Sequence, residues 1–327
     1  MAFRLKLVPD STSFDFFKHQ VLTFGFSVFM VLASVVLVLV QGLNFGIDFK
    51  GGTTIRTEST AALDVGAYRA ALQPLNLGDV SITEVFDPTF AADQHVAMIR
   101  IQAQEGDEAI TPEQMTAIEA ALVGADAAVK IVSTESVGPK VSGELIWTAI
   151  WSVLAATVAI LFYIWLRFEW QFSVGAVAAL IHDIVVTVGI FSLFQIKFDL
   201  TIIAALLTIL GYSINDTVVV FDRLRENLVK YKTMPLREVM NISVNETLSR
   251  TVMTSGTTLL ALIALLVLGG DVIRGFVFAM TWGVVVGTYS SVFVAKNIVL
   301  FLGVERNKEK KDPAAEFFTE KVSDADN

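Results

Sequence analysis

Long apolar stretches alternate with short polar ones along this chain. The first covers residues 21–42, and five more fall within residues 145–303, at 145–166, 172–194, 200–224, 252–268 and 275–302. Each has at least the roughly 17 residues with which a helix crosses a bilayer. No small-residue cleavage site follows the first stretch, so we interpret it as an uncleaved span rather than a signal peptide. The pattern predicts six transmembrane helices.

Residues 43–144 have the pattern of a soluble domain instead. Four segments alternate polar and apolar residues, as strands do, and two segments between them have helical spacing. In chain order they are strand 53–59, helix 63–72, strands 80–86 and 96–103, helix 112–123 and strand 130–137. The order β-α-β-β-α-β is that of a ferredoxin-like domain. The predicted fold class is a polytopic α-helical membrane protein with a ferredoxin-like α+β domain between its first and second spans.

Basic residues are concentrated at one set of helix ends. The loops there contain Arg167, Arg223, Arg225, Lys230, Lys232 and Arg237, whereas the opposite turns hold only Lys197 and Arg274. Short cytoplasmic loops are enriched in Lys and Arg. We therefore predict that residues 1–20 and 304–327 are cytoplasmic and that the soluble domain faces outward. The tail, residues 304–327, is charged and aperiodic, which predicts disorder.

The amino-acid composition argues against several kinds of catalytic and ligand-binding site. Hydrophobic residues make up 54% of the chain and charged residues 17%, a balance typical of membrane proteins. The chain has no cysteine and only three scattered histidines, and it has neither a GxxxxGK[ST] nor a GxGxxG loop. We expect a protein that is not an enzyme and that binds no cofactor, no metal and no nucleic acid.

One acidic residue lies inside an apolar stretch. Asp216 belongs to the fourth predicted span and has Ser213, Asn215 and Thr217 beside it. A carboxylate at the bilayer centre costs about 2.5–3.5 kcal/mol on insertion scales, so such a residue is a functional-site hypothesis by default. The cost calls for a partner elsewhere in the bundle.

Arg250 is the partner that spacing predicts. The only break between the fourth and fifth spans is 232–235, which contains Pro235, and a proline fits the first turn of a new helix. Asp216 is seventeen residues before Thr233 and Arg250 is seventeen after it, so antiparallel helices would place them at one level. Arg250 shares a polar stripe with Thr254. The pair could be a static packing contact or a proton relay.

Two other features lie within predicted spans. His182 and Asp183 occur in the third span, and Asp183 lies on a face of small residues. Asp183 could be a second proton site or a hydrogen-bonded structural group. In the sixth span, small residues recur every four positions and include Gly283 and Gly287, which predicts close packing against another helix in this chain or a partner.

Five segments together resemble one known family. They are NFGIDFKGGT at 44–53, GPKVSGEL at 138–145, LIHDIVVTVGIFSLFQIKFDLT at 180–201, GYSINDTVVVFDRLREN at 211–227 and LSRTVMTSGTTLL at 248–260. These resemble the SecF family, bacterial inner-membrane subunits of the SecD–SecF protein-export complex in the resistance–nodulation–division superfamily. The resemblance covers roughly residues 14–303 and is most specific at 183–258.

The resemblance implies a partner and a role. It implies pairing with SecD, work beside the Sec translocon channel subunits, and action on unfolded preprotein on the periplasmic side, driven by the proton gradient. It also implies that Asp216 and Arg250 take part in proton movement. Our hypothesis is that protonation of Asp216 breaks its ion pair with Arg250 and thereby moves the outward domain. Two rival functions are a proton-driven small-molecule efflux half-transporter and a membrane-anchored scaffold without proton transport.

Overall fold

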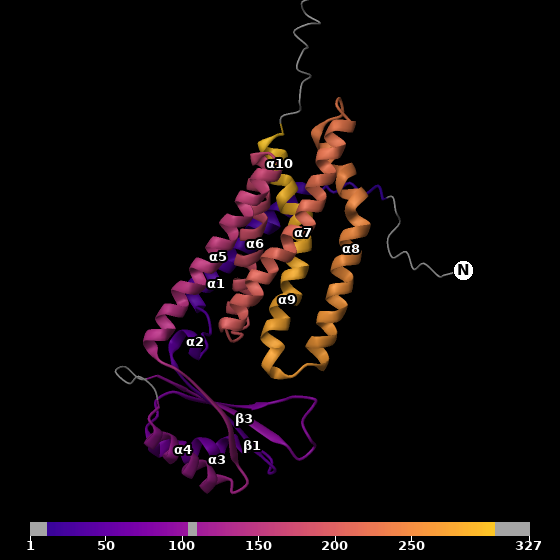
Figure 1. Cartoon of the computed structure of the whole chain (residues 1–327). Helices are drawn as coiled ribbons and strands as arrows, with labels where there is room; N and C mark the ends of the chain where they lie inside the picture. The colour runs from indigo at the N-terminus through magenta and orange to yellow at the C-terminus, as the bar shows by residue number, and fades with distance from the viewer. Residues whose placement is uncertain (1–11, 104–109, 305–327) are drawn as a thin grey trace, which may run out of the picture.

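The computed structural model describes residues 12–103 and 110–304. Figure 1 shows a bundle of long helices with a small α/β domain at one end. Within the described residues, six helices are long and apolar enough to cross a membrane. They are α1 (Gln20–Gln41), α5 (Pro139–Arg167), α6 (Trp170–Leu193), α7 (Leu200–Lys230), α8 (Leu236–Leu268) and α9 (Asp271–Ser290) with its extension. The predicted six spans are confirmed. The predictions for the chain's first residues and its tail lie mostly outside the described residues.

The extension of α9 is not a regular α-helix throughout. A π-helical turn, η2 (Ser291–Ala295), joins α9 to α10 (Lys296–Leu302), and the three together form one span. π-helical turns inside helices frequently mark functional sites. Here the turn places Lys296, a buried lysine, at its end.

The α/β domain has the predicted ferredoxin-like topology. Its elements are β1 (Gly52–Ser59), α3 (Val65–Leu72), η1 (Gln73–Leu75), β2 (Val80–Val85), β3 (His95–Gln102), α4 (Pro112–Ala125) and β4 (Lys130–Val137). The sheet order is β2-β3-β1-β4 and every neighbouring pair is antiparallel. Ile55 and Ile99 pair across the sheet and pack on Leu122 of α4, so the domain has an apolar core of its own.

A glycine pair starts the sheet. Gly51 and Gly52 follow the short helix α2 (Ile47–Lys50), and both have positive φ angles, +77° and +135°. A Cβ on Gly52 would lie 2.3 Å from the carbonyl oxygen of Ile101 on β3. Only glycine allows the chain to leave α2 and enter β1 this close to β3.

The domain directly contacts the ends of two spans, α7 and α9. The amide of Gly46 donates to the carbonyl of Phe198 at 2.8 Å, and the amide of Leu200, the first residue of α7, donates to Asp48 Oδ2 at 3.0 Å. At the start of α9, Asp271 and Phe86 exchange two hydrogen bonds of 2.7 and 2.9 Å. A displacement of α7 or α9 therefore reaches the domain without a flexible linker between them.

The spans differ in how deeply they are buried. About half of the apolar window of α6 and of α9 is buried inside the chain, and nearly as much of α7, against about a tenth or less for α1, α5 and α8. The centre of the bundle is thus built from α6, α7 and α9, while α1, α5 and α8 lie at its periphery. Every membrane-embedded carboxylate described next belongs to the central helices.

Candidate functional site

Asp216 is buried at the contact between α7, α8 and α9. Only 3% of the residue is exposed. Ser255 Oγ on α8 donates a hydrogen bond to Asp216 Oδ2 at 3.4 Å, and the same Ser255 hydroxyl lies 2.7 Å from Thr288 Oγ1 on α9. The three side chains therefore form a hydrogen-bonded chain that joins the three helices at one level.

Arg250 is not ion-paired with Asp216, contrary to our expectation. No ion pair within 4.0 Å joins the two in the described part of the chain, and the arginine side chain is exposed. The two groups interact electrostatically at longer range, through the same helix hairpin. Arg250 therefore lies beside the Asp216 site, on its exposed flank.

The cause of this difference is the register of the hairpin. Three side-chain contacts across α7 and α8 define it, Tyr212 with Thr258, Asp216 with Ser255 and Asn227 with Ser243. Each pair is centred on residue 235 or 236, whereas the sequence argument placed the centre at Thr233. The offset of about two residues at the turn becomes four to five residues on the far helix, which is about 6–7.5 Å, slightly more than one helical turn. That turn brings Ser255 rather than Arg250 opposite Asp216.

The other polar residues near Asp216 divide between two environments. Thr254 is half-buried beside the Asp216 carboxyl, and its hydroxyl donates to the Arg250 carbonyl at 3.0 Å. Asn215 is exposed on α7, and the described residues offer its side chain no hydrogen-bond partner. Ser213 points away from Asp216 and binds Asp183 instead.

Asp183 is the centre of a second buried polar cluster. Ser213 Oγ of α7 and Ser290 Oγ of α9 both donate to Asp183 Oδ2, at 2.6 and 2.8 Å. His182 Nδ1 lies 3.0 Å from the other carboxylate oxygen. His182 Nε2 is buried with no hydrogen-bond partner among the described residues. Asp183 therefore joins α6 to α7 and α9 through Oδ2, while Oδ1 contacts its neighbour His182 on α6.

The small-residue ridge of α9 brings these groups close together. A Cβ on Gly283 would lie 2.4 Å from the Ile209 side chain, and one on Gly287 would lie 3.0 Å from Ser213 Cβ. Both glycines therefore pack directly on α7, within this chain. On the same helix, Ser290 contacts Asp183 of α6 and Thr288 contacts Ser255 of α8.

Sequence reasoning missed three of the hydroxyl partners: Ser255, Thr288 and Ser290. A signal for the first was present, because Thr251, Ser255 and Thr258 recur at spacings of four and three on one face of α8. Thr288 and Ser290 follow the glycine ridge, and nothing in the α9 pattern alone shows which neighbouring carboxylate each reaches. No cluster of three metal-ligating side chains occurs in the ranges 12–103 and 110–304.

Comparison with known proteins gives consistent matches. The family model for the C-terminal part of the protein export membrane proteins SecD/SecF matches residues 117–305, and the SecD/SecF GG motif matches residues 36–62, which include Gly51 and Gly52. The protein translocase subunit SecF of Rhodobacter capsulatus is 70% identical over 99% of both chains. That of Vibrio alginolyticus is 40% identical over 92% of this chain and 93% of its own.

A solved structure agrees with the sequence matches. The crystal structure of SecDF from Thermus thermophilus, a translocon-associated membrane protein, matches with a TM-score of 0.79 and 34% identity. The match covers 90% of this chain but 39% of the SecDF chain, so this chain spans about two fifths of that protein. With two family models, relatives matched over nearly full length and this structural likeness in agreement, the chain belongs to the SecF family of multi-pass protein-export membrane proteins.

Proposed function

We propose that this chain is an accessory subunit of the Sec protein translocase in the bacterial inner membrane. It pairs with SecD and uses the proton-motive force to promote translocation and release of unfolded preprotein on the periplasmic side, next to the Sec channel subunits. The names of its relatives support the translocase role. This chain matches 39% of the SecDF chain, and the rest of that chain supports SecD as the partner.

The proposed orientation places both termini in the cytoplasm and the ferredoxin-like domain in the periplasm. The turn between α7 and α8 lies at the end of the bundle away from the domain (Figure 1), and it is rich in Lys and Arg. Cytoplasmic loops carry such an excess of positive charge. At the domain end, Lys197 in the turn before α7 and Arg274 in the first turn of α9 are each paired with an aspartate.

The observation that carries the proposal is the hydrogen-bonded chain from Asp216 through Ser255 to Thr288. When Asp216 is ionised, the Ser255 hydroxyl donates to the carboxylate. When a proton binds, the carboxyl group becomes a donor to Ser255 Oγ, and the Ser255 hydroxyl is free to donate to Thr288 Oγ1. A hydroxyl can donate or accept. Protonation thus reverses the direction of the two bonds that join α7, α8 and α9. The Thr288 hydroxyl, which donates to Ser255 when Asp216 is ionised, then donates to the Val284 carbonyl, 2.7 Å away.

Arg250 takes a longer-range part in this cycle. While Asp216 is ionised, the guanidinium on the exposed flank attracts it, and that attraction disappears when the carboxyl is neutral. Binding of one proton to Asp216 therefore changes the force between α7 and α8, and with it their favoured relative position. The membrane potential supplies about 2.3 kcal/mol per charge per 100 mV, which matches the roughly 1–3 kcal/mol of typical coupling between sites.

The contacts at the outer ends of the spans transmit the movement. Leu200 begins α7, sixteen residues before Asp216, and is bonded to Asp48 beside the glycine pair of the domain. Asp271 begins α9 and is bonded to Phe86 at the end of β2. A shift of α7 against α9 therefore changes the distance between two points at which the domain is held, which moves the domain and the preprotein segment bound to it.

The test compares two Asp→Asn variants in the same helix. Asp216→Asn keeps the shape of the side chain and removes the titrating group. Asp222→Asn is the matched control, because Asp222 is exposed on α7 and pairs with Arg167 at 3.2 Å. Both variants are co-reconstituted with SecD in vesicles with the translocase. Preprotein export is measured with and without a proton gradient, and proton flux is measured with a pH-sensitive dye.

We expect Asp216→Asn to remove the gradient-dependent part of export and the proton flux, while Asp222→Asn retains both. Insertion and folding remain intact, because an amide also accepts the Ser255 hydrogen bond. Full gradient-dependent export by Asp216→Asn would refute the proton relay. Normal export together with absent flux in the wild type would instead indicate a scaffold.

A further inference from the structure

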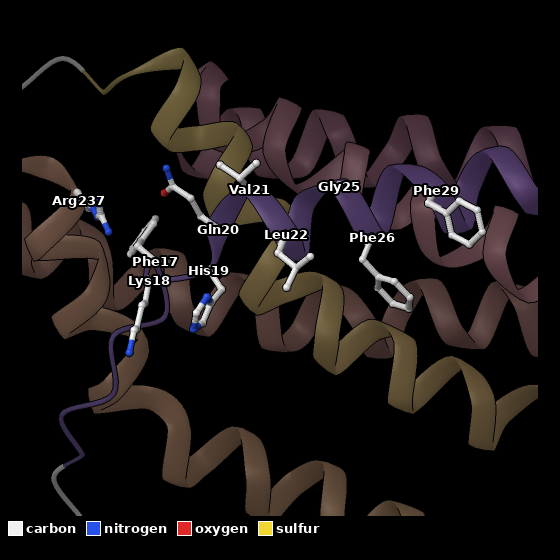
Figure 2. Close-up of a pocket in the computed structure, with 10 residues that line it drawn as sticks. All are labelled: Phe17, Lys18, His19, Gln20, Val21, Leu22, Gly25, Phe26, Phe29 and Arg237. Carbon is white, nitrogen blue, oxygen red and sulfur yellow. The ribbon is translucent and has the colours of Figure 1, made fainter.

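A groove runs along the inner half of α1. Figure 2 shows its lining, which comes from the segment before α1, the first ten residues of α1, and the start of α8. Its volume is about 740 Å³, within the range of roughly 300–1,000 Å³ that is usual for ligand pockets. The lining residues are Phe17, Lys18, His19, Gln20, Val21, Leu22, Gly25, Phe26, Phe29 and Arg237.

The lining changes from basic to apolar along the helix axis. Lys18, His19 and Arg237 lie at the end that the proposed orientation places at the cytoplasmic surface. Leu22, Phe26 and Phe29 follow toward the membrane interior, and they are 72%, 52% and 63% exposed. None of the ten lining residues is acidic, and the two carboxylates nearest in sequence, Asp15 and Glu238, line no part of the groove.

All three basic side chains line the same groove. In Figure 2, Lys18, His19, Leu22 and Phe26 extend to one side of α1, and Arg237 approaches from α8. Arg237 lies over the ring of Phe17, 5.6 Å from its centroid. None of the three basic side chains has an ion pair within 4.0 Å in the described part of the chain. Their charge is therefore available to a ligand.

The segment that carries Lys18 and His19 is held firmly in place. Lys296 Nζ donates to the carbonyl of Phe16 at 2.9 Å and lies 3.8 Å from the centroid of the Phe17 ring. On α8, Asn245 accepts from the amide of Phe14 at 2.9 Å and donates to its carbonyl at 2.8 Å. The groove is therefore a built feature between α1 and α8.

We propose that this groove is a binding site for an anionic phospholipid of the cytoplasmic leaflet. The headgroup phosphate lies among Lys18, His19 and Arg237, and one acyl chain follows Leu22, Gly25 and Phe29 into the membrane. Gly25 to Phe29 lie about 8–14 Å along α1 from Gln20, which is the depth of an upper acyl chain. A basic pocket between spans on the cytoplasmic side is the arrangement that binds anionic headgroups. The assignment rests on the proposed orientation and is independent of proton movement.

The first experiment measures lipid retained by the full chain. The protein is purified from nanodiscs of phosphatidylcholine containing phosphatidylglycerol or cardiolipin, and bound lipid is counted by native mass spectrometry. We expect anionic lipid to be retained over phosphatidylcholine. Lys18→Gln with Arg237→Gln should weaken retention roughly 30-fold, from about five-fold per basic residue. The control pair Arg225→Gln and Lys230→Gln removes the same charge from the same end and should leave retention unchanged.

A second variant separates a site from general surface attraction. Nothing lies within 4 Å of a Cβ built on Gly25, so Gly25→Leu fits the fold while filling the groove. We expect it to reduce retention of anionic lipid although all charges remain. Retention equal to that of the wild type, in Gly25→Leu or in the Lys18/Arg237 double variant, would overturn the proposal.

The same preparation distinguishes two other possible occupants of the groove, a simple anion and a helix of SecD. Competition by millimolar inorganic phosphate alone would indicate a simple anion site and overturn the lipid assignment. Because the chain has no cysteine, Leu22→Cys carries the only thiol. Efficient cross-linking from this position to SecD in the complex, with no lipid retained, would indicate a partner helix in the groove and likewise overturn it. Export defects have no bearing on these outcomes.

Discussion

Two carboxylates lie in the centre of the same bundle, and they are treated differently by their neighbours. Asp183 has partners on both oxygens, at 2.6, 2.8 and 3.0 Å, and its side chain is 1% exposed. Among the described residues, Ser255 donates a long hydrogen bond of 3.4 Å to Asp216, which also lies beside Thr254 and an exposed arginine. Ser213, which binds Asp183, lies only three residues from Asp216 on α7.

The difference shows that a buried carboxylate can either connect helices rigidly, which we call a joint, or change protonation state, which we call a switch. A buried carboxylate with hydrogen-bond partners on both oxygens rigidifies the helices that it joins. A carboxyl group with one long bond can gain or lose a proton with little rearrangement of its neighbours. We infer that Asp183 fixes α6, α7 and α9 together, and that this fixed joint is the reference against which Asp216 moves α8. Variants that change the free energy of unfolding by different amounts test this contrast.

Asp183→Ala should have the largest effect, about 4 kcal/mol. It leaves the Ser213 hydroxyl buried without its acceptor and leaves Ser290 with only the Gly287 carbonyl at 3.1 Å, and lost hydrogen bonds of this kind cost roughly 1–3 kcal/mol each. The measurement is equilibrium unfolding of the full chain in mixed micelles with increasing dodecyl sulfate. Asp183→Asn is the control, because its amide oxygen still accepts both serine bonds, and it should lose far less.

The same Asp183→Asn variant tests whether Asp183 is structural while Asp216 carries the proton. We expect it to retain gradient-dependent export, in contrast to Asp216→Asn. Loss of export with unchanged stability would contradict the assignment of Asp183 as a joint and make it a second proton site.

The sequence predicted the helices and the domain better than the contacts between them. Each helix or strand carries its own hydropathy or alternation pattern, so the six spans and the ferredoxin-like order could be predicted from the sequence alone. The Asp216 environment depends on hairpin register, and a two-residue error at Pro235 replaces Arg250 with Ser255. Ser290 was not predictable as a partner of Asp183, because its contact depends on how closely Gly287 lets α9 approach α7.

Gly283→Ala should have the next largest effect, about 2 kcal/mol. The added Cβ would lie 2.4 Å from Ile209 on α7, and overpacking of this kind costs roughly 1–3 kcal/mol. Gly211→Ala is the matched control within α7, since nothing lies within 4 Å of its Cβ. It should be neutral or slightly stabilising, because alanine favours helix over glycine. Equal destabilisation by both variants would show that the α7–α9 approach is not set by this ridge.

Tyr68→Phe should cost about 1 kcal/mol, the usual net contribution of a hydrogen bond. In the ferredoxin-like domain the Tyr68 hydroxyl donates to Asp126 Oδ2 at 3.1 Å, a carboxylate contact outside the membrane. Burial first, and then this bond, raise the pKa of Tyr68 from 10.0 to about 12.

The raised pKa gives this contact a pH signature. Above pH 10 the unfolded chain loses the tyrosine proton while the folded chain keeps it, so stability falls as pH rises from about 10 to 12. Tyr68→Phe should remove that part of the slope. Tyrosinate absorbance of the wild type minus that of the variant gives the midpoint directly, and a midpoint near 10 would contradict the buried hydrogen bond.

Arg250→Gln should have the smallest effect on stability, within about 0.5 kcal/mol, because the side chain is exposed and has no ion pair in the described part of the chain. Its effect on export should nevertheless be large, since the long-range attraction to ionised Asp216 is lost. Arg250→Lys keeps the charge and should restore part of the gradient-dependent export, whereas Arg225→Gln, on the same hairpin, should leave export unchanged. A stability loss of several kcal/mol in Arg250→Gln would instead mean that the arginine and Asp216 form a static pair, and the contrast between the two carboxylates would then disappear.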